Sequence, residues 1–347
     1  MLSKGFKIVS PKTFEIYYED IKIKENHALV KVEMGAICKA DLRYYMGKRD
    51  KKVLGLKYPM RLIHEATGVV IKDPTGTFEV GQRVVLVPNI FSSKLNHSKR
   101  TFLEDSSLGE NYDPFAKFAS SNVDGFSCEY LSFPVRNIIP FKESTPIHKA
   151  VFSELTSVGI SAMRRCGDLN NKVIGVWGDG ILGYILSSIL VNNTNSRIIS
   201  IGKNGEKLEQ FKSHKTYYIK DHNIKKENID IAFECVGGNS SKFAINEIID
   251  VINIGGQIVL TGVAENNIEI NTRKILEKGL TLTGSTRSSV EDFKKSISLI
   301  EETPYGDALD TLIKDIRMVE NITDYYEVFE IESENRTLRK TIMKLNL

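Results

Sequence analysis

The pattern of hydrophobic and polar positions changes character near residue 147. Before that point, β-branched runs alternate with breaks that contain Gly, Pro or Asp, which is typical of short strands joined by loops. The runs that predict strands are residues 27–38, 62–71 and 80–88. Residues 90–124 are polar and irregular and predict a long loop, and such loops are either functional or poorly ordered.

Beyond residue 147 the hydrophobic spacing becomes helical, and residues 146–165 predict one helix. Strand-like and helix-like segments then alternate. The predicted strands are residues 172–177, 197–202, 229–237 and 256–263, and the predicted helices are 180–192, 206–212 and 240–252. This alternation predicts a parallel, doubly wound sheet and an α/β fold. The last segment predicts an amphipathic helix at 290–301 followed by a strand-rich tail.

Length and composition then narrow the class of protein. A chain of 347 residues predicts two domains, because single cores seldom grow past about 250–300 residues. A hydrophobic fraction of 41% argues against disorder, and a net charge of +3 argues against an electrostatic nucleic-acid binder. The start of the chain predicts no signal peptide, and the most apolar run, 181–191, is too short to cross a bilayer. We therefore expect a soluble cytoplasmic protein without a membrane partner.

The four cysteines are dispersed along the chain, at Cys38, Cys128, Cys166 and Cys235. No two of them form a CxxC pair, so the sequence predicts neither a zinc ribbon nor a disulfide framework. Isolated thiols fit a reducing compartment.

A glycine motif, Gly178-Asp179-Gly180-Ile181-Leu182-Gly183, follows a predicted strand and opens a predicted helix. In that context GxGxxG predicts a dinucleotide site, because its glycines allow a tight turn, close approach of a pyrophosphate, and close packing of helix on strand. The alternative is a glycine-rich turn that binds nothing.

The end of the next strand bears on the choice of cofactor. An NAD site usually has an acidic residue there for the ribose 2′-hydroxyl, whereas this chain has Gly202 followed by Lys203. Lys203, with help from Lys207, would attract a 2′-phosphate, so we predict NADP(H) rather than NAD(H). The alternative is that Lys203 is a solvated turn lysine.

A set of metal-ligating side chains lies in the first half of the chain. Cys38 at the end of a predicted strand, the pair His64 and Glu65, and Glu154 offer a thiolate, an imidazole and carboxylates, which suit a catalytic zinc. Taken singly, a lone cysteine is usually a small buried hydrophobe and a His-Glu pair is usually on the surface. Spacing alone does not establish the site.

A family resemblance adds to this interpretation. The segments CKADLRYYMG, LIHEATG, DGFSCEYL, SELTSVGISAMRR, GDGILG and ECVGG, in this order, resemble the zinc-dependent medium-chain alcohol and polyol dehydrogenases. The resemblance implies a GroES-like catalytic domain over residues 1–150, completed by 286–347, and a Rossmann NADP-binding domain over 151–285. It also implies that Cys38, His64 and one or both of Glu65 and Glu154 hold zinc, and that Asp41 orients the zinc-bound histidine.

Two departures from the family matter. Relatives with a second, structural zinc carry four clustered cysteines in the lobe that corresponds to residues 90–124, and this chain has none there, so we expect one zinc. Many relatives also have Ser or Thr two residues after the zinc cysteine, where this chain has Ala40. The proton relay must then use zinc-bound water with Glu65 or Glu154, or else Tyr44 or Tyr45.

Further segments, among them RYYMGKRD, WGDG, FECVGG, LEKGLTL and GSTRS, resemble the ribitol-5-phosphate dehydrogenase subgroup. That resemblance implies reduction of D-ribulose 5-phosphate with NADPH, which supplies CDP-ribitol for teichoic acid or capsule. It also implies a homodimer or homotetramer, and a cytidylyltransferase of the same pathway as a possible partner. The candidate ligands of the substrate phosphate are Arg43, Arg49 and Arg287, each of which is otherwise a solvated surface charge.

Two other functions remain open from the sequence. One is a zinc polyol, sorbitol or threonine dehydrogenase that acts on a non-phosphorylated substrate. The other is a redox-silent nucleotide-binding protein, against which the retention of all four candidate zinc ligands argues.

Overall fold

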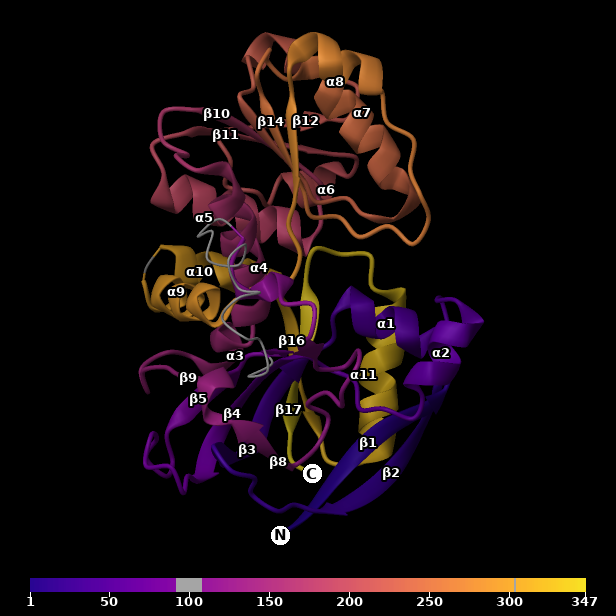
Figure 1. Ribbon diagram of the computed structural model, residues 1–347, viewed down its shortest axis with the longest axis vertical. Coiled ribbons are helices and arrows are strands. Elements are labelled where there is room, and N and C mark those ends of the chain that lie inside the picture. The colour runs from indigo at the N-terminus through magenta and orange to yellow at the C-terminus, as the bar shows by residue number, and fades with distance from the viewer. Residues whose placement is uncertain (92–107, 303) are drawn as a thin grey trace. The chain divides into compact units, whose positions relative to one another are not determined.

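The computed structural model describes residues 1–91, 108–302 and 304–347. The chain forms two compact units (Figure 1). The first contains the described residues within 1–103, 110–154 and 289–347, and the second those within 104–109 and 155–288. Residues 92–107, which belong to the predicted loop over 90–124, lie outside the described residues.

The first unit is rich in strands. Its strands are β1 (Leu2–Ser10), β2 (Thr13–Asp20), β3 (His27–Ala36), β4 (Glu65–Lys72), β5 (Arg83–Leu86), β6 (Asn89–Ile90), β7 (Lys117–Phe118), β8 (Tyr130–Pro134), β9 (Ile138–Pro140), β16 (Ile313–Val319) and β17 (Lys340–Leu345). Its helices are α1 (Lys39–Tyr45), α2 (Lys51–Lys57), α3 (Ile147–Ala150), α9 (Val290–Glu301), α10 (Tyr305–Ala308) and α11 (Ile322–Glu334).

The main sheet of this unit brings distant parts of the chain together. In the described residues its strand order is β16-β17-β3-β4-β5-β9, with β8 also paired to β3. Strand β3 lies between β17 and β4, so that Ala36 is opposite both Ile342 and Glu65. The end of β3, the start of β4 and the C-terminal strand therefore meet at one place in the sheet.

Helix α11 contradicts part of the prediction for the C-terminal tail. The sequence predicts a strand-rich tail after residue 301, whereas residues 322–334 are helical. Tyr325 and Phe329 of α11 are fully buried, and both rings contact Phe14 of β2, at centroid distances of 4.8 and 4.9 Å. Aromatic residues favour strands by local propensity, and here packing against the N-terminal hairpin favours the helix instead.

The second unit contains a parallel sheet. Its strands are β10 (Val173–Trp177), β11 (Arg197–Gly202), β12 (Lys215–Tyr218), β13 (Ile231–Glu234), β14 (Gln257–Leu260) and β15 (Thr281–Gly284). Its helices are α4 (Ser153–Met163), which starts at the boundary with the first unit, α5 (Ile181–Asn193), α6 (Gly205–Leu208), α7 (Ser241–Val251) and α8 (Thr272–Lys278).

The strand order β12-β11-β10-β13-β14-β15 is that of a doubly wound nucleotide-binding sheet. Alternate side chains of β10 enter two different cores. Ile174 and Val176 pack with residues of α5, whereas Trp177 packs with residues of α7, so the two helices cover opposite faces of the sheet (Figure 1). This confirms the predicted α/β fold class.

The prediction of a single helix over residues 146–165 is wrong in one respect. It is divided into α3 and α4 at Val151 and Phe152, both of which are fully buried. Because apolar residues continue through this break, hydrophobic spacing did not reveal it.

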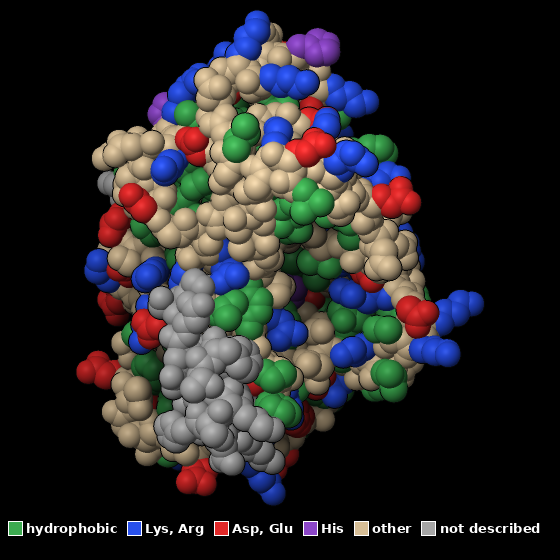
Figure 2. Space-filling view, turned by 45° about the horizontal axis from the view of Figure 1, so that its top comes forward, with side chains coloured by type: hydrophobic (Ala, Val, Ile, Leu, Met, Phe, Trp, Pro, Cys, Tyr) green, Lys and Arg blue, Asp and Glu red, His purple; other side chains and the backbone are tan. Residues whose placement is uncertain are grey.

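The surface carries both signs of charge. On the face drawn in Figure 2, basic and acidic side chains are interspersed, as the near-balanced composition leads one to expect. Within the described part of the chain, no helix has the length and apolar character needed to cross a bilayer.

Candidate active site

Three side chains in the first unit are grouped as metal ligands would be. One ligating atom from each of Cys38, His64 and Glu65 lies within 4.8 Å of the others. His64 and Glu65 are buried, and Cys38 is partly exposed. A thiol, an imidazole and a carboxylate suit zinc, and a set of three leaves a position for water or substrate.

The backbone turns sharply where these residues meet. Strand β3 ends at Ala36, so Cys38 does not end a strand as the sequence predicts, but is the N-cap residue of α1. Ile63, just before His64, has a φ of +71°, a conformation that β-branched residues rarely adopt. Such strain is concentrated at functional sites, and here it precedes the two consecutive residues that both join the group.

His64 is held by two polar side chains. Its Nδ1 lies 3.3 Å from Oδ1 of the fully buried Asp41 and 2.9 Å from Oγ of Ser120, which itself donates to Asp41 Oδ1 at 2.7 Å. Although burial disfavours the imidazolium, Asp41 and Cys38 raise the pKa of His64 well above its ordinary value. With Nδ1 engaged in this way, Nε2 is the nitrogen available to a metal.

The two carboxylate oxygens of Glu65 have different surroundings. Oε2 accepts a hydrogen bond from the ammonium of Lys340, at 2.6 Å, and both side chains are buried. Oε1 is buried and has no hydrogen-bond partner among the described residues. A buried carboxylate oxygen normally has a partner, so Oε1 of Glu65 is suited to ligate a metal ion.

Glu154 is buried in the same unit, but it is not part of the group of three ligands. Burial raises the pKa of Glu154 to about 7, with Glu65 and Asp41 adding to the rise and His64 and Lys340 opposing it. Of the two glutamates that the sequence proposes as ligands, the structure therefore groups Glu65 with Cys38 and His64.

Ser120 and Lys340 were missed by the sequence analysis. Ser120 lies in the polar, aperiodic segment before β8, where no pattern distinguishes one serine from another. Lys340 begins β17, whose sequence KTIMKL mixes polar and apolar residues, so its burial could not be predicted from that pattern.

The two tyrosines proposed for the proton relay differ in environment. The Tyr44 hydroxyl lies 3.4 Å from Oγ of Ser121, next to the serine that contacts His64. The Tyr45 hydroxyl donates to Oε1 of Glu330 on α11, at 2.5 Å. Tyr45 is thus engaged in packing α1 against α11, whereas Tyr44 contacts the residue that follows Ser120.

In the second unit, the glycine motif forms the turn between β10 and α5. Gly178 has a φ of +130°, and a Cβ atom there would lie 2.9 Å from the backbone of Cys235. A Cβ atom on Gly183 would lie 2.0 Å from the carbonyl oxygen of Gly178. Gly180 is the N-cap residue of α5, and Ile181 and Leu182 begin the helix. The geometry matches a pyrophosphate-binding turn.

A carboxylate of the glycine motif contacts the turn after β11. Gly202 replaces the acid that an NAD site usually has at this position, yet Asp179 Oδ2 accepts hydrogen bonds from the backbone N–H groups of Lys203 and Asn204, at 2.8 Å each. Lys203 is exposed and Lys207 is partly exposed on the short helix that follows.

The three arginines proposed for a substrate phosphate lie in different places. Arg43 is on α1, and the guanidinium of Arg49 stacks on the ring of Tyr44, with its Cζ 4.4 Å from the ring centroid. Both are in the first unit, whereas Arg287 is in the second, at a φ of +58°. Burial lowers the pKa of Arg287.

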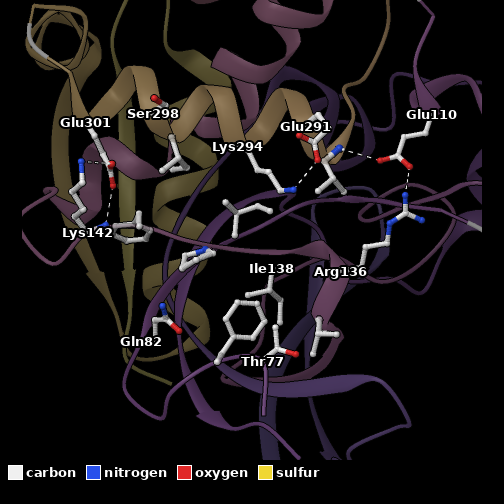
Figure 3. A pocket seen from close by; sticks show the side chains of 17 residues that line it. Thr77, Gln82, Glu110, Arg136, Ile138, Lys142, Glu291, Lys294, Ser298 and Glu301 are labelled. Atoms are coloured by element: carbon white, nitrogen blue, oxygen red, sulfur yellow. Dashed lines mark hydrogen bonds and ion pairs between the residues drawn. The ribbon is translucent and has the colours of Figure 1, made fainter. Parts of the chain in front are cut away.

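A groove of about 970 Å³ lies elsewhere in the first unit, between α9 and the edge strand β9 (Figure 3). None of the predicted site residues lines it. Ion pairs join Arg136 to Glu110, Lys142 to Glu301 and Lys294 to Glu291 along its rim. Of these three pairs, Lys142–Glu301 joins α9 to the segment that follows β9, whereas Glu291 and Lys294 both lie on α9.

Two family models match the chain. The alcohol dehydrogenase GroES-like domain matches residues 24–143, and the zinc-binding dehydrogenase domain matches residues 190–302. The first match contains Cys38, His64 and Glu65, and the second contains Gly202 and Lys203.

Curated relatives match the chain over nearly its full length. A ribulose-5-phosphate reductase of Streptococcus pneumoniae is 37% identical, covering 99% of this chain and 97% of the relative. One of Bacillus spizizenii is 36% identical, covering 97% of this chain and 98% of the relative. Among solved structures, TarJ of S. aureus in complex with NADPH is 32% identical with a TM-score of 0.85, and the match covers all of both chains.

Proposed function

Because the chain belongs to the zinc-binding alcohol dehydrogenase family, with a GroES-like domain and a zinc-binding dehydrogenase domain, we propose that it is an NADPH-dependent D-ribulose-5-phosphate reductase. Its product is then D-ribitol 5-phosphate. The observation that carries the proposal is the buried group of Cys38, His64 and Glu65, in a chain that resembles ribulose-5-phosphate reductases from end to end.

In this proposal Cys38, His64 and Glu65 hold one zinc ion, and the chain has no second, structural zinc. The donor atoms and the unpartnered Oε1 of Glu65 support the assignment. When bound, zinc supplies a Lewis acid that polarises the C2 carbonyl of the ketose.

The neighbouring side chains prepare these ligands. Asp41 and Ser120 fix the ring of His64, as the outer partners of metal-bound histidines do. Lys340 balances the charge of Glu65 and fixes Oε2, so that Oε1 would be available to a bound metal ion. Cys38 is anchored through its backbone N–H, which donates to Asp41 Oδ2 at 3.1 Å.

We assign proton delivery to Glu154, because Ala40 provides no hydroxyl for the usual relay. A carboxyl group with a pKa of about 7 holds a proton on Oε at neutral pH for part of the time. It is therefore suited to give that proton to the oxygen formed when the ketone is reduced. Tyr44 is the alternative donor.

The second unit binds NADPH, which supplies the hydride. Gly178 to Gly183 receive the pyrophosphate, and Lys203 and Lys207 receive the 2′-phosphate. Arg43, Arg49 and Arg287 are the candidate ligands of the substrate phosphate, because the guanidinium fork matches phosphate oxygens.

In the cell we expect the product to be activated by a cytidylyltransferase to CDP-ribitol and used for teichoic acid or capsule. We also expect a cytoplasmic homodimer or homotetramer. These expectations rest on the family resemblance.

The direct test follows NADPH oxidation by the purified zinc-loaded protein with a panel of substrates. We expect D-ribulose 5-phosphate to give the highest kcat/KM and ribitol 5-phosphate as the product identified by mass spectrometry. Higher kcat/KM on D-ribulose, D-fructose or another free ketose would favour a polyol dehydrogenase. Absence of turnover with every substrate in either direction, with zinc and NADPH bound, would favour a redox-silent nucleotide-binding protein.

A further inference from the structure

Three hydrogen bonds fasten the glycine motif to the end of β11 and to the turn that follows it. The backbone N–H of Gly178 donates to the carbonyl of Ile201, at 2.8 Å. The N–H groups of Lys203 and Asn204 both donate to Oδ2 of Asp179, at 2.8 Å. The side chain of Asp179 therefore fixes the backbone of the residue that we expect to meet the 2′-phosphate.

Gly202 leaves the space that this carboxylate needs. A Cβ atom on Gly202 would lie 2.7 Å from Cβ of Asp179 and 2.9 Å from its Oδ2. Any side chain at position 202, including the acid typical of NAD sites, would require Asp179 to move. Gly202 and Asp179 are thus one arrangement rather than two separate features of the sequence.

The rest of the turn is fixed by the same chain of contacts. The Asn204 side chain accepts a hydrogen bond from the N–H of Lys207, at 3.1 Å, and the carbonyl of Gly202 accepts one from Ile219, at 2.9 Å. The backbone on both sides of Lys203 is held by hydrogen bonds, while Lys203 itself is an exposed residue.

We propose that Asp179 is a positioning residue that sets the preference for NADPH over NADH by fixing the turn of Lys203. The proposal rests on the proposed use of NADPH. A carboxylate repels a phosphate, so Asp179 does not bind the 2′-phosphate itself. It acts by removing the freedom of the turn before the cofactor binds, which lowers the ordering cost of placing the lysine.

Substitutions at Asp179 can distinguish positioning of the turn from an effect of the negative charge. Asparagine keeps an oxygen that can accept both backbone hydrogen bonds, but it removes the negative charge, whereas alanine removes both. Asp221 provides a matched control, because its Oδ1 accepts from the backbone N–H of Asn223, at 2.8 Å, in another turn of the same unit.

The experiment measures the dissociation constants of NADPH and NADH by nucleotide fluorescence for the wild-type protein, Asp179→Ala, Asp179→Asn and Asp221→Ala. No substrate is needed. Hydrogen exchange of the peptide that contains Lys203 and Asn204 is measured on the same samples, and circular dichroism checks that each variant is folded.

We expect Asp179→Ala to weaken NADPH about tenfold and NADH much less, because the turn must then be ordered when NADPH binds; a tenfold change corresponds to about 1.4 kcal/mol. Its 203–204 amides should exchange faster. Asp179→Asn should retain the wild-type preference and exchange, and Asp221→Ala should change neither.

Four results would overturn the proposal. Tighter NADPH binding in both Asp179 variants would show that the carboxylate acts by repulsion. A selective loss of NADH would show that it serves the ribose 2′-hydroxyl. An unchanged NADPH preference in Asp179→Ala would show that the turn needs no such support. If Asp179→Ala does not fold, a lost NADPH preference in Asp179→Asn contradicts the proposal by itself. A wild-type protein that prefers NADH would instead refute the proposed cofactor.

Discussion

At the scale of single residues, the buried pair of Glu65 and Lys340 joins segments that are 275 residues apart in the sequence. The pair is almost fully buried, so neither charge is compensated by water. Removal of one partner from such a pair usually costs about 3–5 kcal/mol, because the other charge is left buried and unpaired.

We therefore predict that Lys340→Met lowers the melting temperature of the metal-free protein by roughly 5–10 °C. Added zinc should offset part of this loss, because the ion is itself a positive charge beside Glu65. Differential scanning fluorimetry with and without zinc measures both effects. Lys294→Met is the control, since Lys294 forms an exposed pair with Glu291 that is worth about 0.5 kcal/mol or less. Equal melting temperatures for the two variants would contradict this account of Lys340.

A second residue-scale prediction concerns pH. Glu227 in the second unit is buried, which by itself would raise its pKa, but hydrogen bonds from Tyr217, Lys215 and Arg197 lower the pKa to about 2. The unfolded chain should have the ordinary value near 4.5. Because the folded-state pKa is the lower one, the stabilisation is complete above about pH 4.5 and disappears as the pH falls towards 2.

Glu227→Gln should therefore destabilise the protein by about 2 kcal/mol at pH 7 and by progressively less between pH 4.5 and 2. Thermal unfolding across this range tests it, with the exposed Glu277→Gln as a control that should have little effect at any pH. A stability difference that does not vary with pH would contradict the assignment.

The residues of the candidate site differ in how visible they are in the sequence. Cys38, His64 and Glu65 are recognisable because they lie in short motifs that resemble the family. Ser120 and Lys340 act through contacts with residues 79 and 275 positions away, and nothing in their local sequence indicates those contacts. Asp179 is visible as part of the glycine motif, but its bonds to Lys203 and Asn204 depend on how β10 and β11 pair.

At the scale of elements, α5 approaches the strand end so closely that position 183 has no room for a side chain. A Cβ atom there would lie 2.0 Å from a backbone carbonyl, which cannot move without moving the pyrophosphate-binding turn. Helix α2 provides a contrast, because a Cβ atom on its Gly55 would have no heavy atom within 4 Å.

We predict that Gly183→Ala weakens NADPH binding at least about tenfold and lowers the melting temperature, because the clash moves α5 away from the turn. Gly55→Ala should leave NADPH binding unchanged and stabilise the protein by about 0.5–1 kcal/mol, since alanine is the better helix former. Fluorescence titration and thermal unfolding measure the two properties. Wild-type NADPH affinity in Gly183→Ala would refute the tight-packing argument.

Elements whose hydrophobic pattern has one clear period were predicted well. The strand at 197–202 matches β11, and the helix at 290–301 matches α9. Local pattern failed where tertiary packing decides the outcome. Tyr325 and Phe329 favour a strand by propensity but lie in α11, and the buried Val151 and Phe152 hide the break between α3 and α4.

At the scale of the whole molecule, the two proposed halves of the chemistry lie in different units. The group of Cys38, His64 and Glu65 is contained in the first unit, and the glycine motif with Lys203 is contained in the second. Metal binding and nucleotide binding should therefore be separable. We predict that removal of zinc abolishes reduction and leaves the affinity for NADPH nearly unchanged.

The most direct test of the central claim compares zinc-loaded, chelated and zinc-restored protein, with the metal content of each sample measured. The rate of NADPH oxidation with D-ribulose 5-phosphate is recorded for all three, together with the dissociation constant of NADPH. We predict that turnover is lost on chelation and returns with zinc, while the dissociation constant stays within about twofold. Full turnover by verified metal-free protein would contradict the claim that this chain reduces its substrate at a zinc ion held by Cys38, His64 and Glu65.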